Sequence, residues 1–152
     1  MYITAGHKFY CSLKNAKKSF YRAFNSIFGK VGRIAYINVV IELLKAKCLP
    51  SLYYGLEACP INKSQIKSLD FVLNNAFRKI FLTKSYDTAS ECILFFRCSV
   101  SDAIYTRKLK FLTKLQSTEI GPCKLFVKNT VDELATVHEC IHVMTRPTCI
   151  PS

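Results

Sequence analysis

The chain has 152 residues, half of them apolar, so it can bury a core of its own as a single domain. This apolar content excludes a chain that is disordered throughout. The formal net charge of +12, from 22 basic and 10 acidic residues, favours a polyanionic partner, either nucleic acid or an anionic membrane surface.

A short β-hairpin and an amphipathic helix are predicted at the start of the chain. The hairpin strands are Tyr2–Thr4 and Lys8–Tyr10. In the helix that follows, Ser12 serves as the N-cap and Gly29 marks the C-terminal end. Its apolar side chains recur at three- and four-residue spacing, the pattern of one buried helix face: Leu13, Ala16, Phe20, Phe24 and Ile27.

Two further helices are predicted in the middle of the chain. The second begins behind Asn38 and repeats the apolar spacing at Val39, Val40, Leu43, Leu44 and Cys48. Pro50 has no backbone N–H, so we expect it to end this helix or to kink it toward Tyr54. The third opens near Asn62 or Ser64, runs to about Leu82, and carries the apolar residues Ile66, Leu69, Leu73, Phe77 and Ile80.

The pattern weakens toward the end of the chain. A weakly patterned segment covers residues 89–96, and a longer helix after Ser101 turns Ile104, Phe111, Leu112 and Leu115 inward. Gly121 and Pro122 mark a turn, residues 130–139 one more short helix, and residues 146–152 a frayed tail. We therefore predict an all-α bundle of about five helices, with one domain over residues 1–115 and a divergent, partly disordered tail over 116–152.

Basic side chains form the candidate binding surface. Residues 1–114 hold 19 basic and 6 acidic residues, a net +13, whereas residues 115–152 hold 3 and 4, a net −1. No acid precedes Glu42. On the first helix Lys14, Lys18, Arg22 and Asn25 share one stripe, which is typical of a surface that follows a phosphate backbone. The alternative is an ordinary solvated face, but such faces usually mix charges of both signs.

Other basic residues extend this surface. Tyr21 lies beside the first stripe, where its ring can stack on a base or sugar. Arg107, Lys110 and Lys114 repeat the helical spacing farther on, and Arg78 with Lys79 forms a smaller set. The candidate nucleic-acid-binding residues are Lys14, Lys17, Lys18, Tyr21, Arg22, Lys30, Arg33, Arg78, Lys79, Arg107, Lys110 and Lys114.

The sequence offers little for catalysis or metal binding. Two-metal chemistry needs carboxylates brought together, and of the four aspartates only Asp132 has an acidic neighbour, Glu133. The stretch 29–33 lacks the spacing of a phosphate-binding loop. We therefore expect no catalytic residue, metal site, cofactor or small-molecule substrate. A zinc site in the tail stays an alternative, although no standard spacing relates Cys123, His138, Cys140, His142 and Cys149.

Cysteine use and hydropathy indicate an intracellular protein, in the nucleus or cytoplasm. The eight cysteines include no C-x-x-C pair, and residues 1–12 lack the pattern of a signal peptide. We expect most of the thiols to be buried as small apolar groups in a reducing compartment. The longest apolar segment, 49–61, is interrupted by Pro50, Glu57 and Pro60 and is shorter than the ~20 residues of a membrane span.

Two segments, 17–33 and 42–60, resemble the reverse transcriptases of LINE-type (non-LTR) retrotransposons, in particular the jockey-like group. The most specific matches follow one another along several helices: Leu49, Pro50, Tyr54, Gly55, Leu56, Glu57, Ile61, Lys63, Leu69, Asp70, Phe71, Arg78, Lys79 and Ile80. The likeness covers about residues 1–115. It implies the helical thumb that follows the polymerase palm, with the segment 2–6 similar to the end of the primer-grip hairpin.

The resemblance implies a role in holding nucleic acid without copying it. The family's catalytic aspartates, and the Mg²⁺ they bind, would belong to a palm upstream of Met1, so no residue here inherits a catalytic role. The implied activity is non-sequence-specific binding of a template–primer, RNA or RNA–DNA duplex, by a truncated or decayed mobile-element copy. A helical protein-interaction module, with the missing palm or another protein as partner, and a remnant without function are the alternatives.

Overall fold

The computed structural model describes residues 2–4, 10–32, 34–118 and 133–137. The chain divides into two compact units, residues 1–100 and 101–152. The helical domain over residues 1–115 and the divergent tail after it remain predictions. Lys108 on the last long helix forms an ion pair with Glu133.

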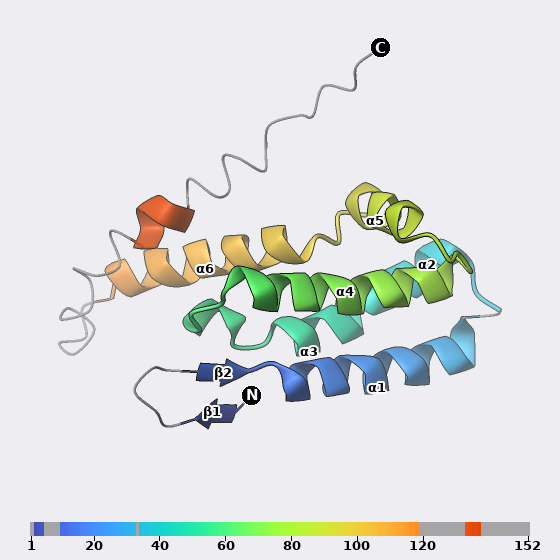
Figure 1. Ribbon diagram of the computed structural model, residues 1–152, viewed down its shortest axis with the longest axis horizontal. Coiled ribbons are helices and arrows are strands. Elements are labelled where there is room, and N and C mark those ends of the chain that lie inside the picture. Colours follow the sequence, from blue (N-terminus) through green and yellow to red (C-terminus); the bar gives the residue numbers. More distant parts are fainter. Residues whose placement is uncertain (1, 5–9, 33, 119–132, 138–152) are drawn as a thin grey trace, which may run out of the picture. The chain divides into compact units, whose positions relative to one another are not determined.

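Helices dominate the described residues (Figure 1). The elements are β1 Tyr2–Thr4, β2 Tyr10–Ser12, α1 Lys14–Val31, α2 Ile37–Leu43, α3 Leu49–Tyr53, α4 Lys63–Ile80, α5 Tyr86–Phe95 and α6 Val100–Gln116. A π-helical turn, Leu44–Cys48, joins α2 to α3, and a 3₁₀ turn, Leu56–Ala58, follows α3. With α2 and α3 counted as one helix, the prediction of an all-α bundle of about five helices is confirmed.

The hairpin at the start differs from its prediction at the second strand. β1 and β2 pair antiparallel, with Ile3 opposite Cys11, and β2 begins two residues later than expected and ends at Ser12. Because Ser12 is paired in the ladder opposite Tyr2, it does not cap α1. The residue before α1 is Leu13, which makes no side-chain capping hydrogen bond.

Helix α1 also ends later than predicted. Gly29 lies inside the helix, and Gly32 takes the C-cap position, where its N–H donates to Phe28 O at 2.9 Å. A Cβ at Gly32 would lie 2.4 Å from Phe28 Cδ2, whereas a Cβ at Gly29 would meet nothing within 4 Å. The contact with Phe28 therefore leaves no room for a side chain at Gly32, although its backbone is right-handed helical.

Pro50 neither ends nor sharply breaks its helix. The segment begins at Ile37, one residue before the expected cap Asn38, and continues to Tyr53 through the π turn. In that turn the N–H of Leu49 reaches back to Leu44 O, which widens the helix just ahead of the proline. Pro50 then occupies the first turn of α3, a position where no backbone donor is required.

The core of the first unit is built from α1, the α2–α3 segment and α4. Its most deeply buried large side chains are Phe20, Ile41, Leu44, Leu52, Leu56, Leu69, Leu73 and Phe77. Helix α4 begins where predicted, because Asn62 and Gln65 form a reciprocal capping box, with Gln65 N donating to Asn62 Oδ1 at 2.8 Å.

Both α4 and α5 end in the same left-handed turn. Leu82 and Arg97 each adopt φ 52° just past the helix. The N–H two residues beyond each helix cap closes the turn: Thr83 N donates to Arg78 O at 3.1 Å and Cys98 N to Ile93 O at 2.9 Å. These turns define the connections at both ends of α5, which the weak sequence pattern over 89–96 located only in part.

The second unit contains α6 and a helical turn at residues 133–137. Ile104 and Leu112 on α6 are buried as predicted, but Phe111 is 40 % exposed. The turn at 133–137 lies within the short helix expected over 130–139. Gly121 and Pro122, the last residues from 138 on, and the Cys/His group of the tail lie outside the described residues.

Candidate nucleic-acid interface

Helix α1 presents an exposed basic stripe. Lys14, Lys18 and Arg22 are exposed, whereas Phe20 and Phe24 on the opposite face are buried. The four-residue steps between these cations correspond to ~6 Å along the helix axis each. Helix α1 contains no acidic residue, so nothing on this helix neutralises the stripe.

Helix α4 runs beside α1 in the same direction. Lys17 Nζ donates a hydrogen bond to Ser68 Oγ, and Lys79 Nζ donates to Asn25 Oδ1 at 3.0 Å. The first contact joins earlier turns of the two helices and the second joins later turns, which fixes the parallel direction. Figure 1 shows both helices running in the same direction, with α3 drawn between them in this view. The basic residues of α1 therefore share one surface with a stripe of α4.

Lys79 belongs to this surface rather than to a separate set with Arg78. Its Nζ lies 5.7 Å from the ring centre of Phe24 and 5.4 Å from that of Phe28, within the range of a cation–π contact. Arg78 is half-buried, and its Nε is buried without a hydrogen-bond partner among the described residues. The helical rotation between neighbouring residues thus separates two cations that the sequence places together.

The remaining predicted residues have different environments. Tyr21 is half-buried, with its ring edge-on to Phe20 at 5.7 Å between centres, which restricts a stacking role. Lys30 is exposed in the last turn of α1, and Arg33 lies outside the described residues. Arg107, Lys110 and Lys114 are exposed on α6 and form a separate set in the second unit.

A groove of about 480 Å³ opens between the starts of α1 and α4. Its walls carry two lysines, three serines and no acid: Ser12, Leu13, Lys14, Lys17, Ser64, Gln65 and Ser68. Ammonium and hydroxyl groups around a concave surface can donate hydrogen bonds to the oxygens of an anion that binds there. The groove therefore continues the basic stripe at its N-terminal end.

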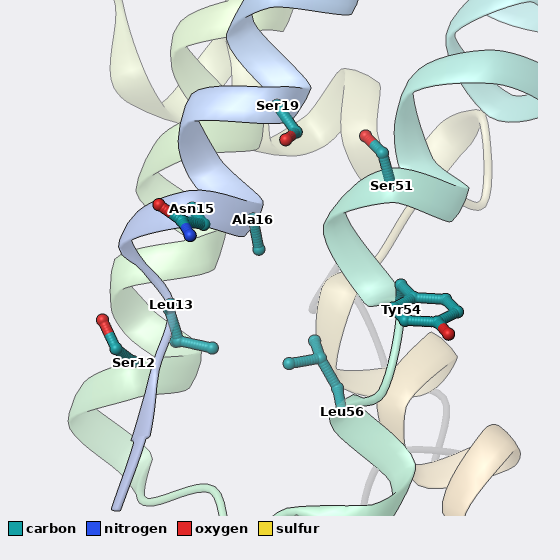
Figure 2. Close-up of a pocket in the computed structure, with 8 residues that line it drawn as sticks. All are labelled: Ser12, Leu13, Asn15, Ala16, Ser19, Ser51, Tyr54 and Leu56. Atoms are coloured by element: carbon teal, nitrogen blue, oxygen red, sulfur yellow. The ribbon is translucent and has the colours of Figure 1, made fainter. Parts of the chain in front are cut away.

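A smaller pocket of about 240 Å³ lies between α1 and α3. Figure 2 shows Ser19 and Ser51 on opposite walls, with Tyr54 and Leu56 below them. None of its lining side chains is charged at neutral pH, and Ser51 Oγ already donates to Cys48 O at 2.8 Å. This pocket supplies no acid–base pair for catalysis.

Sequence reasoning missed Phe71 as a member of this surface. Its side chain is 55 % exposed. It falls on the same three- and four-residue spacing as Ser68 and Lys79, the α4 residues that reach α1. The signal was present in the sequence, because Phe71 does not share the apolar spacing of Leu69, Leu73 and Phe77.

Burial affects cysteine thiols elsewhere in the described part of the chain. Burial raises the pKa of the Cys48 and Cys98 thiols, which keeps them protonated and unreactive. Among the cysteines whose burial the structure describes, Cys48, Cys59 and Cys98 are buried, as we expected for most of the thiols, and Cys92 is half-buried. Within the described ranges no three His, Cys, Asp or Glu side chains gather as metal ligands. No described helix is long and apolar enough to cross a membrane.

Comparison with known proteins leaves the chain without an assigned relative. No family model, no curated protein and no solved structure matches it.

Proposed function

We propose that this chain is a nucleic-acid-binding helical module that grips the sugar–phosphate backbone without reading sequence. The observation that carries the proposal is the acid-free stripe of Lys14, Lys18 and Arg22, which α4 extends with Lys79. Cations on a rigid helix lower the entropic loss on binding, because the helix already fixes their spacing. Counterion release from the polyanion then supplies most of the binding free energy.

The family proposed for this module is the LINE-type reverse transcriptase, of which the chain would be the thumb. The resemblance over residues 1–115 supports this assignment. In that setting the parent activity is RNA-directed DNA synthesis, and the palm with its carboxylates and Mg²⁺ is a separate part. We accordingly expect the purified chain to extend no primer with Mg²⁺ or Mn²⁺, and measurable synthesis would contradict the assignment.

A charge-matched pair of variants tests the binding surface. We expect Lys18→Ala with Arg22→Ala to weaken binding to labelled oligonucleotides about tenfold or more at low salt. Lys47→Ala with Lys84→Ala removes the same charge from exposed sites off the stripe, and should change affinity much less. Fluorescence anisotropy measures both. Equal losses in the two double variants would show that net charge alone, and not this surface, directs binding.

The salt dependence provides a second test. For duplex DNA the slope of log affinity against log salt is about −0.9 for each phosphate contacted, so loss of Lys18 and Arg22 should make the slope shallower by nearly two. A complex insensitive to salt, or no binding at low salt, would overturn the proposal.

A helical protein-interaction module is the second candidate function. It is favoured by exposed apolar side chains at the α1–α2 connection, at the α4–α5 connection and along α5: Ile34, Tyr36, Ile37, Leu82, Tyr86, Leu94 and Phe95. Apolar surface of this kind marks partner contacts or aggregation. Size-exclusion chromatography with light scattering distinguishes the candidates, because a monomer that binds oligonucleotides supports the first, and a protein soluble only with a protein partner supports the second. A monomer that binds neither would point to a remnant without function.

A further inference from the structure

The aromatic ring of Phe71, near the middle of α4, is exposed to solvent. Burying such a side chain stabilises a folded protein, and this ring forgoes much of that stabilisation with 55 % of its surface exposed. A single exposed apolar residue is common and proves nothing by itself. The surroundings of this one carry the inference.

The two contacts between α1 and α4 locate Phe71 along the basic surface. It lies one turn, ~4.5 Å, beyond Ser68 and two turns, ~12 Å, before Lys79 on the same stripe of α4. Ser68 is joined to Lys17 and Lys79 to Asn25, so Phe71 is level with the part of α1 between those residues. That part of α1 carries the exposed cations Lys18 and Arg22.

Negative charge is absent from this side of both helices. Helix α1 has no acid. The one acid of α4, Asp70, is a single residue from Phe71 and is therefore rotated by about 100° around the helix, away from the stripe. An exposed ring that shares a surface with cations, on two helices whose stripes carry no acid, suits a ligand that offers both a flat π-face and negative charge.

Single-stranded nucleic acid has this combination. Its unpaired bases stack on aromatic side chains while its phosphates meet Lys and Arg, and every base has a π-face. In a duplex the faces of the bases are covered by their neighbours, so a ring at the surface of a helix finds nothing to stack on. A polyanion without bases satisfies the cations but leaves the ring unused.

We propose that the α1–α4 surface prefers single-stranded nucleic acid, with Phe71 stacking on an unpaired base and Lys18 and Arg22 contacting the adjoining phosphates. The inference rests on the proposed nucleic-acid function and narrows its partner from a duplex to an unpaired strand.

The absence of tryptophan from the chain allows a direct test. Phe71→Trp introduces a single indole at the proposed stacking position, and oligothymidine should quench its fluorescence, whereas a duplex of equal length should quench it little. Tyr54→Trp is the control, because Tyr54 is 79 % exposed at the end of α3, off the basic surface. Quenching of both variants alike, or of neither although the strand binds, would overturn the stacking role.

Affinity gives an independent measurement. Phe71→Ala should weaken oligothymidine binding about tenfold and duplex binding hardly at all, and Phe71→Tyr should restore the single-strand affinity. Because the side chain is exposed, circular dichroism and the unfolding midpoint should remain those of the native protein. Wild-type protein that binds neither strand form would overturn the proposed function itself. Equal binding to single strand and duplex, unchanged by Phe71→Ala, would overturn this inference alone.

Discussion

At the scale of single residues, burial of the Asp70 carboxyl group makes the stability of the fold depend on pH. Burial raises the pKa of its carboxyl group above 3.8, so the folded state disfavours the ionised form. The contribution of this group to stability is therefore fully present below pH 3.8 and is lost as the pH rises through the folded-state pKa. We expect Asp70→Asn to raise the free energy of unfolding at pH 7, and the gain to disappear near pH 3.

Urea unfolding at the two pH values measures this difference. Asp87→Asn is the matched control, because Asp87 is exposed in the first turn of α5, where its negative charge favours the helix dipole. That substitution should slightly lower stability at pH 7. An Asp70→Asn variant no more stable than the native protein at pH 7 would contradict the burial argument.

Asn74 holds α5 against α4 from within the core. It is 1 % exposed, and its Nδ2 donates to Tyr86 O at 3.1 Å and to Ser90 Oγ at 3.0 Å. Asn74→Ala removes both bonds and leaves a small cavity, so we expect a loss of about 2 kcal/mol in unfolding free energy. Asn75→Ala, one residue along and only half-buried, should change stability by less than about 0.5 kcal/mol. Guanidinium unfolding compares the two, and equal effects would contradict a specific role for Asn74.

The exposure of individual site residues could be predicted only where the spacing of residues within one helix determines it. The exposure of Lys14, Lys18 and Arg22 followed from their positions relative to the apolar stripe of the same helix. The contacts of Lys79 with Phe24, Phe28 and Asn25 could not be predicted, because they depend on how α1 and α4 pair in the folded chain. The half-burial of Tyr21 has the same origin, since a ring at the edge of a stripe is covered or exposed by its neighbours.

At the scale of elements, the two glycines near the end of α1 give opposite predictions. Gly29→Ala should raise the free energy of unfolding by about 0.5–1 kcal/mol, because an exposed helical site gains propensity and the new Cβ meets nothing. Gly32→Ala should lower it by about 1–3 kcal/mol, because its Cβ would lie 2.4 Å from Phe28 Cδ2 and 2.6 Å from Phe28 O. Thermal unfolding by circular dichroism measures both. If Gly29→Ala lowered the free energy of unfolding, that result would instead favour a helix that ends at Gly29, as the sequence predicted.

Element interiors were easier to predict than element ends. The apolar spacing in α1 and α4 identified both long helices, because side-chain burial repeats at each turn. Their ends depend on backbone partners, and only the capping box at Asn62 has a local sequence signature. Ser12 pairs with Tyr2 in the β-hairpin and does not cap α1. Pro50 follows a π turn, which no sequence pattern predicts.

At the scale of the whole molecule, the fold class followed from composition and periodicity, but the division into units did not. Charge changes sign near residue 115, where we expect the partner-binding part of the chain to end. Contacts divide the chain into two compact units at residue 100. Charge reports on partners and solvent, whereas domain boundaries reflect packing, so the two need not coincide.

The net charge of +12 should make the fold and the complex respond to salt in opposite ways. Repulsion among the basic residues destabilises the folded chain. Salt weakens this repulsion, because the Debye length falls from about 30 Å at 0.01 M to about 8 Å at 0.15 M. We therefore expect the unfolding midpoint to rise over that range while affinity for oligonucleotides falls. The Lys18→Ala, Arg22→Ala protein should unfold at a higher temperature than the native chain at 0.01 M, because the α1 stripe loses two neighbouring cations. That difference should shrink at 0.15 M. A midpoint that falls with salt would mean that attractive pairs outweigh the repulsion, and would contradict this prediction.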